Sequence, residues 1–192
     1  MKILTRIVFI ILGIISIPLI IALFISKDAS YAQTIEINAP IDVVWEQTNS
    51  LEDLDKWSPW NDYDPAMKKE MSGIDGTIGA KQSWESDAKE VGTGSQTISK
   101  IEAPNFFGTD LKFYVPYESE AKGYVKLAQE GDVTFATWGF ESTMPYPMNL
   151  MKLVYNFEDM MAADWQKGLS RLKNLSEVSY ANQKVETIEE NK

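Results

Sequence analysis

The residues that could do chemistry in this chain are carboxylates, lysines, arginines and tyrosines, because the sequence contains neither histidine nor cysteine. This absence removes Ser-His and Cys-His nucleophiles, thiol redox chemistry and disulfides, and almost every zinc, copper or haem site. We therefore expect no metal and no cofactor. Any acid–base chemistry would use the remaining ionisable side chains.

Glu158 is the carboxylate in the least ordinary place. Residues 148–175 follow a Pro-Tyr-Pro stop, and their apolar positions recur at the helical period, which predicts one long amphipathic helix. At about 100° per residue, Glu158 lies about 60° from the centre of the apolar stripe. If it faced a cavity, it could bind a ligand hydroxyl or act as a general acid or base. The favoured alternative places it at the edge of the stripe, reaching solvent or a strand lysine, because charged residues are rarely buried.

Tryptophans are the second set of candidates. They could line a pocket for a flat apolar ligand, although ordinary core packing is equally open for each of them. Gly168 also interrupts the helical stripe, and we expect it to permit a close helix–sheet approach or a bend. No catalytic residue is assigned apart from the candidate Glu158. The candidate ligand-binding residues are Trp60, Trp84, Phe113, Leu127, Trp138, Glu158, Met161 and Trp165.

A sheet must cover the apolar face of such a helix. Alternation predicts a first strand at 32–38, and two short helices follow, the second with a capping box formed by Ser50 and Asp53. Short connections favour an antiparallel meander, and the facing of the last strand stays open because both its sides are apolar. Period-two segments predict six further strands at 67–72, 79–86, 91–102, 109–115, 118–130 and 132–142.

The N-terminus carries an uncharged apolar run at residues 7–25. As a helix it would cover roughly 28 Å, close to the thickness of a bilayer core. Lys2 and Arg6 precede the run, so the positive-inside rule puts the N-terminus in the cytoplasm and the domain outside it. The alternative is a signal peptide cleaved after Ala32, which would give a secreted or periplasmic domain. The run is longer than a usual signal core, which favours a retained single-pass anchor.

The net charge of −10 and the isoelectric point near 4.6 argue against nucleic-acid binding. The expected partners are therefore a membrane, through residues 7–25, and a hydrophobic small molecule or lipid.

Several stretches resemble the START-like or SRPBCC superfamily, and within it the bacterial proteins grouped as polyketide cyclase/dehydrase and lipid-transport-like. The resemblance spans roughly residues 32–176. It implies a helix-grip domain whose sheet and C-terminal helix enclose a mostly apolar cavity for lipids, sterols, polyketides or similar molecules. The stretches are Ala39-Pro40-Ile41-Asp42-Val43-Val44-Trp45, Trp57-Ser58-Pro59-Trp60, Asp64-Pro65-Ala66-Met67-Lys68, Gly79-Ala80-Lys81-Gln82-Ser83-Trp84 and Lys167-Gly168-Leu169-Ser170-Arg171-Leu172-Lys173.

The sequence therefore predicts an α+β helix-grip fold, with a curved seven-stranded antiparallel sheet around a long C-terminal helix, plus one transmembrane helix. We expect an anchor and linker at 1–31, the domain at 32–178 and a polar, disordered tail at 179–192. Three functions stay open: a membrane-anchored hydrophobic-ligand or lipid binder, a metal-free cyclase- or dehydratase-like enzyme, and an envelope structural or interaction module.

Intact-mass measurement of the mature protein tests the N-terminal prediction. A retained anchor gives the mass of the chain with residues 7–25 still present, because a transmembrane helix is not removed. A mass that begins at Gln33 would contradict the anchor and support signal cleavage.

Overall fold

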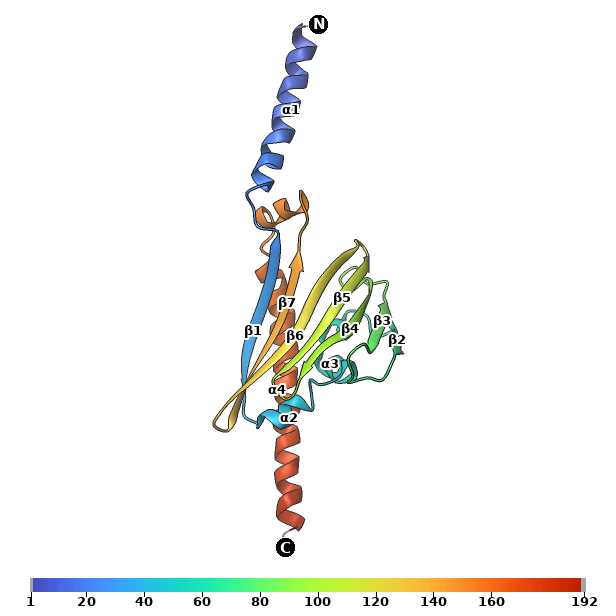
Figure 1. The fold of residues 1–192 in the computed structure, drawn as a ribbon, viewed down its shortest axis with the longest axis vertical. Coiled ribbons are helices and arrows are strands. Elements are labelled where there is room, and N and C mark those ends of the chain that lie inside the picture. The colour runs from blue at the N-terminus through green and yellow to red at the C-terminus, as the bar shows by residue number, and fades with distance from the viewer. Residues whose placement is uncertain (1, 191–192) are drawn as a thin grey trace.

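The computed structural model describes residues 2–190 and begins with an isolated apolar helix, α1 (Lys2–Ala22). The domain follows at once with β1 (Asp28–Ile37), two short helices, α2 (Ile41–Trp45) and α3 (Leu51–Trp57), and the 3-10 turn η1 (Pro59–Asp62). The chain then forms β2 (Lys68–Ser72), β3 (Lys81–Glu85), β4 (Thr93–Glu102), β5 (Phe106–Val115), β6 (Ser119–Glu130), β7 (Val133–Thr143), the 3-10 segment η2 (Met148–Leu153) and α4 (Phe157–Glu190) (Figure 1).

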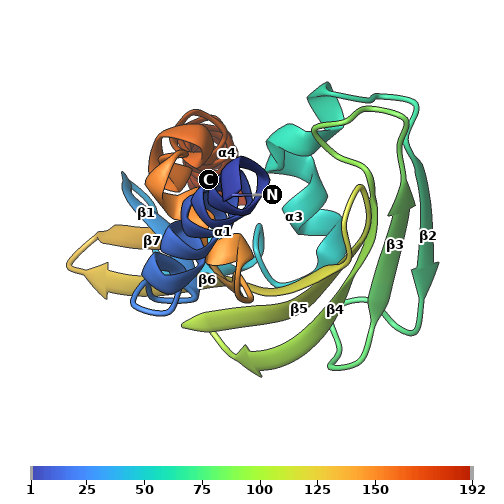
Figure 2. The same ribbon diagram turned by 90° about the horizontal axis from the view of Figure 1, so that it is seen from above.

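The strands form one seven-stranded sheet in the order β1-β7-β6-β5-β4-β3-β2, and every neighbouring pair is antiparallel. Figure 2 shows the sheet curving around α4 and α3, which lie on its concave side. The chain is a meander from β2 to β7, and β1 joins the free edge of β7. The predicted α+β helix-grip architecture is confirmed.

The predicted long helix was wrong at its beginning. Residues 148–153 form a 3-10 turn, and α4 starts only at Phe157. The Asn156 side chain accepts a hydrogen bond from the Glu158 amide at 3.2 Å, which supports a new helix start at this point. The apolar spacing of 148–155 is helical, but its apolar side chains are not buried against the sheet.

The helix also continues well beyond the expected end at Leu175. It runs to Glu190, so residues 179–190 of the predicted disordered tail are helical, and residues 191–192 lie outside the described part of the chain. Tertiary contacts carry the helix past Leu175, because Ser176 is buried, Glu177 accepts hydrogen bonds from Asn38, and Tyr180 packs against the core. The predicted division of the chain into domains stays a prediction.

The core fills the half of the sheet farther from α1. Leu169 and Leu172 of α4 are almost completely buried there against Leu127, Ala136 and residues of β1 and α2. A smaller cluster of Leu51, Ala80, Ile98 and Phe107 lies under α3. Ser50 accepts the Asp53 amide at 3.0 Å at the start of α3, so the predicted cap is confirmed.

Gly168 sets how closely α4 approaches the sheet. A Cβ atom at this position would lie 2.8 Å from Cζ3 of Trp138 on β7 and 3.3 Å from Cδ of Pro59. The first contact is shorter than Cβ atoms adopt, so a neighbouring group would have to move, and the second is tighter than most packed contacts. Gly168 therefore permits the close approach that the sequence suggested.

We expect Gly168→Ala to lower the free energy of unfolding by about 1–2 kcal/mol, because the overpacking cost exceeds the gain in helix propensity. Urea unfolding of the full chain in detergent, followed by tryptophan fluorescence, measures the change. Gly13→Ala is the matched control, since nothing lies within 4 Å of a Cβ there. A Gly168→Ala protein as stable as this control would contradict the packing argument.

Candidate ligand-binding cavity

A cavity of about 290 Å³ lies between the concave face of the sheet and a cover formed by α4, α3 and η1. It occupies the half of the sheet nearer α1, beyond the core. Its lining is mostly aromatic and aliphatic, and it comes from β2 through β7 as well as from the helical cover. Such a lining is typical of sites for apolar small molecules.

Trp138 and Trp165 form the floor of the cavity. Their rings are stacked, with centroids 4.2 Å apart and planes 17° apart, and Nε1 of Trp165 donates to the Trp138 carbonyl at 3.0 Å. Trp57 and Trp60 contact this pair edge-on, with centroids 4.9 Å from Trp138 and 6.2 Å from Trp165 respectively. Because the indole donor of Trp165 is satisfied, the stack presents an apolar surface to the cavity.

Trp84 and Phe113 form the opposite wall, with ring centroids 5.9 Å apart. Trp84 lies directly over Gly94, where a Cβ atom would come within 2.4 Å of its ring. Nε1 of Trp84 is buried and has no hydrogen-bond partner among residues 2–190. Protein atoms therefore cover this indole donor, and it contributes no hydrogen bond to the cavity surface.

A polar network lies on the same wall. Nζ of Lys69 donates to Oδ1 of Asp55 at 2.7 Å and to Oδ1 of Asn61 at 2.6 Å, and Nε2 of Gln82 donates to Oδ2 of Asp55 at 2.7 Å. Lys69 pairs directly with Trp84 across β2 and β3. An ammonium group has three donors, so one donor of Lys69 remains beyond these two bonds. The network ties α3 and η1 to the sheet and gives the cavity one polar side.

Part of the cavity lining lies at the α1 end of the domain. β7 runs toward that end, where it leads into η2, and antiparallel pairing makes β3 and β5 end at the same edge of the sheet. Several half-exposed lining residues lie at this edge or on the first turns of α4, which begins at this end of the domain (Figure 1). We call these residues the mouth of the cavity: Met67, Val91, Phe113, Phe140 and Met161.

The structure brings together six of the eight predicted ligand-binding residues. Leu127 lies in the core instead, and Glu158 is exposed on the first turn of α4, where it lines a separate surface pocket with Tyr31 and Glu141. The favoured reading of Glu158, at the edge of the stripe, is the one that the structure supports. The six residues lining the cavity are Trp60, Trp84, Phe113, Trp138, Met161 and Trp165.

Sequence reasoning missed the polar wall. β2 carries polar side chains on both faces, so its alternation could not show that Lys69 turns inward. Gln82 offered a usable signal, because it shares a strand face with Trp84 two residues away. Asp55 offered no such signal, because an acidic residue on a short helix is normally expected to face solvent.

Two charged contacts hold η1 against α4 beside the cavity. Asp62 pairs with Arg171 at 2.7 Å and with Lys167 at 2.5 Å, and the hydrogen bond from Arg171, followed by that from Lys167, lowers the pKa of Asp62. The Tyr63 hydroxyl donates to Asp164 at 2.9 Å, and this hydrogen bond raises the pKa of Tyr63. These contacts fix the edge of the helical cover.

The comparisons with known proteins identify the fold of this chain. No family model and no curated protein matches the sequence. Among solved structures, a protein from Nitrosospira multiformis has a TM-score of 0.54 at 17% identity, covering 76% of this chain and 94% of that one. Ara h 8.0201 has a TM-score of 0.52 at 11% identity, covering 81% and 99%. Major latex-like protein 151 from Panax ginseng has 0.51 at 11%, covering 80% and 98%.

The last two are Bet v 1-like proteins of the helix-grip or SRPBCC superfamily. At these identities the likeness shows that the chain has the same fold. The resemblance noted in the sequence is confirmed at that level.

The Asp62 contacts predict a pH dependence. The folded-state pKa of Asp62 is below its unfolded value of about 3.9, so the contacts stabilise the fold above that pH, and the contribution is lost as pH falls through the folded value. We expect wild type to be more stable than Asp62→Asn at neutral pH, by less than about 1 kcal/mol because the pair is partly exposed. Urea titrations at a series of pH values should show the difference vanishing in acid. A pH-independent difference would contradict the ion-pair origin.

Proposed function

We propose that this chain is a membrane-anchored domain that binds a hydrophobic small molecule or lipid in the cavity between the sheet and α4. The observation that carries the proposal is an aromatic cavity with half-exposed lining residues at the end of the domain to which α1 is attached. A domain tethered at its mouth can exchange a water-insoluble ligand with the bilayer.

The N-terminal helix supports the anchor. Ile3–Ala22 is long and apolar enough to cross a membrane, and its side chains are exposed almost throughout. Cleavage after Ala32 would remove Asp28–Ala32 from β1, which pairs with Gly139–Thr143 of β7. Losing half of an edge strand would leave these β7 residues with no strand partner other than β6 and expose their other edge, which argues for a retained N-terminus. The charge pattern favours a cytoplasmic N-terminus and an extracytoplasmic domain.

The polar wall supports an amphiphilic ligand. An acceptor oxygen beside Lys69 could take the third lysine donor, while a hydrocarbon portion lies against Trp138 and Trp165. A fatty acid or another lipid with a small polar head has this distribution of groups.

The enzymatic hypothesis gains no support from the cavity. Asp55 uses both oxygens to accept hydrogen bonds from Lys69 and Gln82, and Glu158 lies outside the lining. Binding is therefore the function that the cavity supports best.

A cavity-filling variant tests the proposal. Leu111 is half-buried in the cavity wall, so Leu111→Trp should occupy part of the volume, whereas Ile78→Trp adds the same ring at a position that is exposed outside it. We expect Leu111→Trp in the full chain to bind a fluorescent polyene fatty acid at least about tenfold more weakly, which is about 1.4 kcal/mol. Energy transfer from tryptophan to the polyene in detergent measures binding.

Wild type and Ile78→Trp should bind alike. Equal binding by all three proteins would place the fatty acid outside the cavity and contradict the proposal. Absence of binding by wild type, with no lipid found on extraction of the purified protein, would favour a structural or interaction module.

A further inference from the structure

Residues 145–155, which include η2, expose an unusual amount of apolar surface at the α1 end of the domain. Val154 is 77% exposed and Leu153 65% exposed, and Phe24, in the link to α1, is 85% exposed. Clusters of this kind on a protein surface mark an interaction site. The other large apolar residues exposed in this segment are Tyr146, Met148, Met151 and Tyr155.

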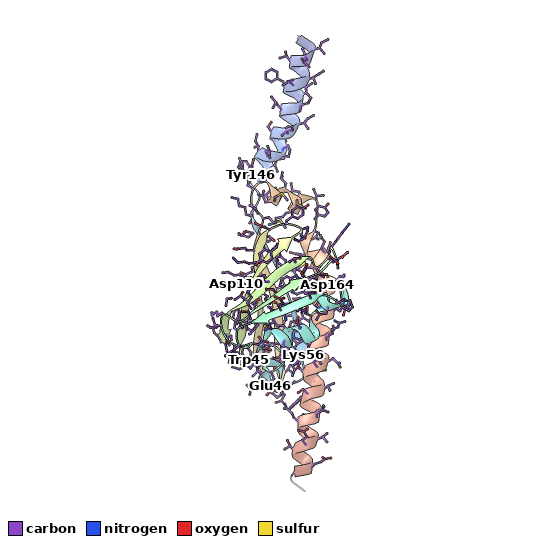
Figure 3. All side chains as sticks on the ribbon, turned by 90° about the vertical axis from the view of Figure 1, so that its right-hand side faces the viewer. Trp45, Glu46, Lys56, Asp110, Tyr146 and Asp164 are labelled. Atoms are coloured by element: carbon purple, nitrogen blue, oxygen red, sulfur yellow. The ribbon has the colours of Figure 1, made fainter. Side chains whose placement is uncertain are left out.

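This segment is fixed to the foot of α1 by hydrogen bonds. Nδ2 of the buried Asn149 donates to the carbonyls of Ala22 at 2.7 Å and Ile25 at 2.9 Å, and Nζ of Lys152 donates to the carbonyl of Asp28 at 2.6 Å. The last carbonyls of a helix lack intrahelical partners, so Asn149 caps α1 from within the domain. The exposed apolar side chains are therefore held beside the end of the apolar helix, near Tyr146 in Figure 3.

The charge of the segment differs from that of the rest of the chain. The chain contains 28 acidic residues in 192, yet residues 144–157 contain none and carry a single charge, on Lys152. An anionic lipid surface repels acidic patches, and membrane interfaces accept apolar, tyrosine-bearing ones. The acidic surface of this protein is interrupted where the chain meets the apolar helix.

We propose that residues 145–155, the juxtamembrane platform, lie in the interfacial layer of the same bilayer that α1 crosses. The inference rests on the proposed anchor. Leu153 and Val154 enter the lipid near the head groups, Tyr146 and Tyr155 lie at the polar boundary, and Lys152 stays with the carbonyls at the foot of α1. The platform and the capped helix together hold the cavity mouth against the membrane, in place of a domain that swings on a flexible linker.

The absence of cysteine permits a direct test. Single variants Leu153→Cys and Val154→Cys of the full chain, each carrying a nitroxide label, are placed in phosphatidylcholine nanodiscs. Collision with molecular oxygen, which concentrates in lipid, is compared with collision with a water-soluble nickel chelate. Ile14→Cys on α1 is the lipid reference, and Val178→Cys on α4, 51% exposed and far from the platform along the helix, is the water reference.

We expect the labels at 153 and 154 to collide more often with oxygen than with nickel, as at 14, and the label at 178 to show the opposite. Nickel-accessible labels at 153 and 154 combined with a lipid-exposed label at 14 would overturn the platform and leave the anchor intact. A nickel-accessible label at 14 would overturn the anchor itself. Dipolar broadening between labels at 153 would show that a second copy covers this surface, and would also overturn the proposal.

Discussion

The structure depends on the close contact between α4 and β7 at Gly168 and the tryptophan stack. On one side of this contact, Leu169 and Leu172 lie directly on the sheet and make a solid core. On the other side, the two indoles of Trp138 and Trp165 separate helix and sheet by the thickness of their stacked rings. The same contact that closes the core therefore opens the cavity. A longer side chain at position 168 would push α4 away from β7, and this would change the core and the cavity at the same time.

The sheet could be predicted because its strands obey simple periodicity. Six period-two segments became β2 to β7 with boundaries shifted by a few residues at most, and the Ser50 cap placed α3 correctly. The start of α4 could not be predicted, since residues 148–155 repeat their apolar residues with helical spacing. Periodicity shows which face of a segment is apolar, but it does not show whether another part of the protein packs against that face. Here the segment turns its apolar residues outward, and Asn149 is used to cap another helix.

The candidate site was predicted in its apolar part and missed in its polar part. Tryptophans at 60, 84, 138 and 165 are large enough that alternation and the helical stripe locate them. From the sequence, Lys69 and Asp55 would be assigned to the surface. A sequence cannot show that these two opposite charges, on a strand and a helix, form an ion pair beside a cavity. Leu127 lies on the concave face as its strand pattern indicated, but in the filled half of the domain. Periodicity shows on which face of the sheet a residue lies. It does not show in which half of the domain, core or cavity, that residue lies.

The short link between α1 and β1 has a thermodynamic consequence. Only residues 23–27 separate the two elements, and the Lys27 carbonyl accepts the Met144 amide at 2.7 Å, so the link has little slack. If the proposed anchor holds the mouth at the lipid surface, the concentration that governs ligand binding is the ligand's mole fraction in the bilayer and not its concentration in water. In that arrangement a ligand would not cross the aqueous phase, and its occupancy would follow membrane composition. A sparingly soluble molecule would then fill the cavity as readily as its abundance in lipid allows.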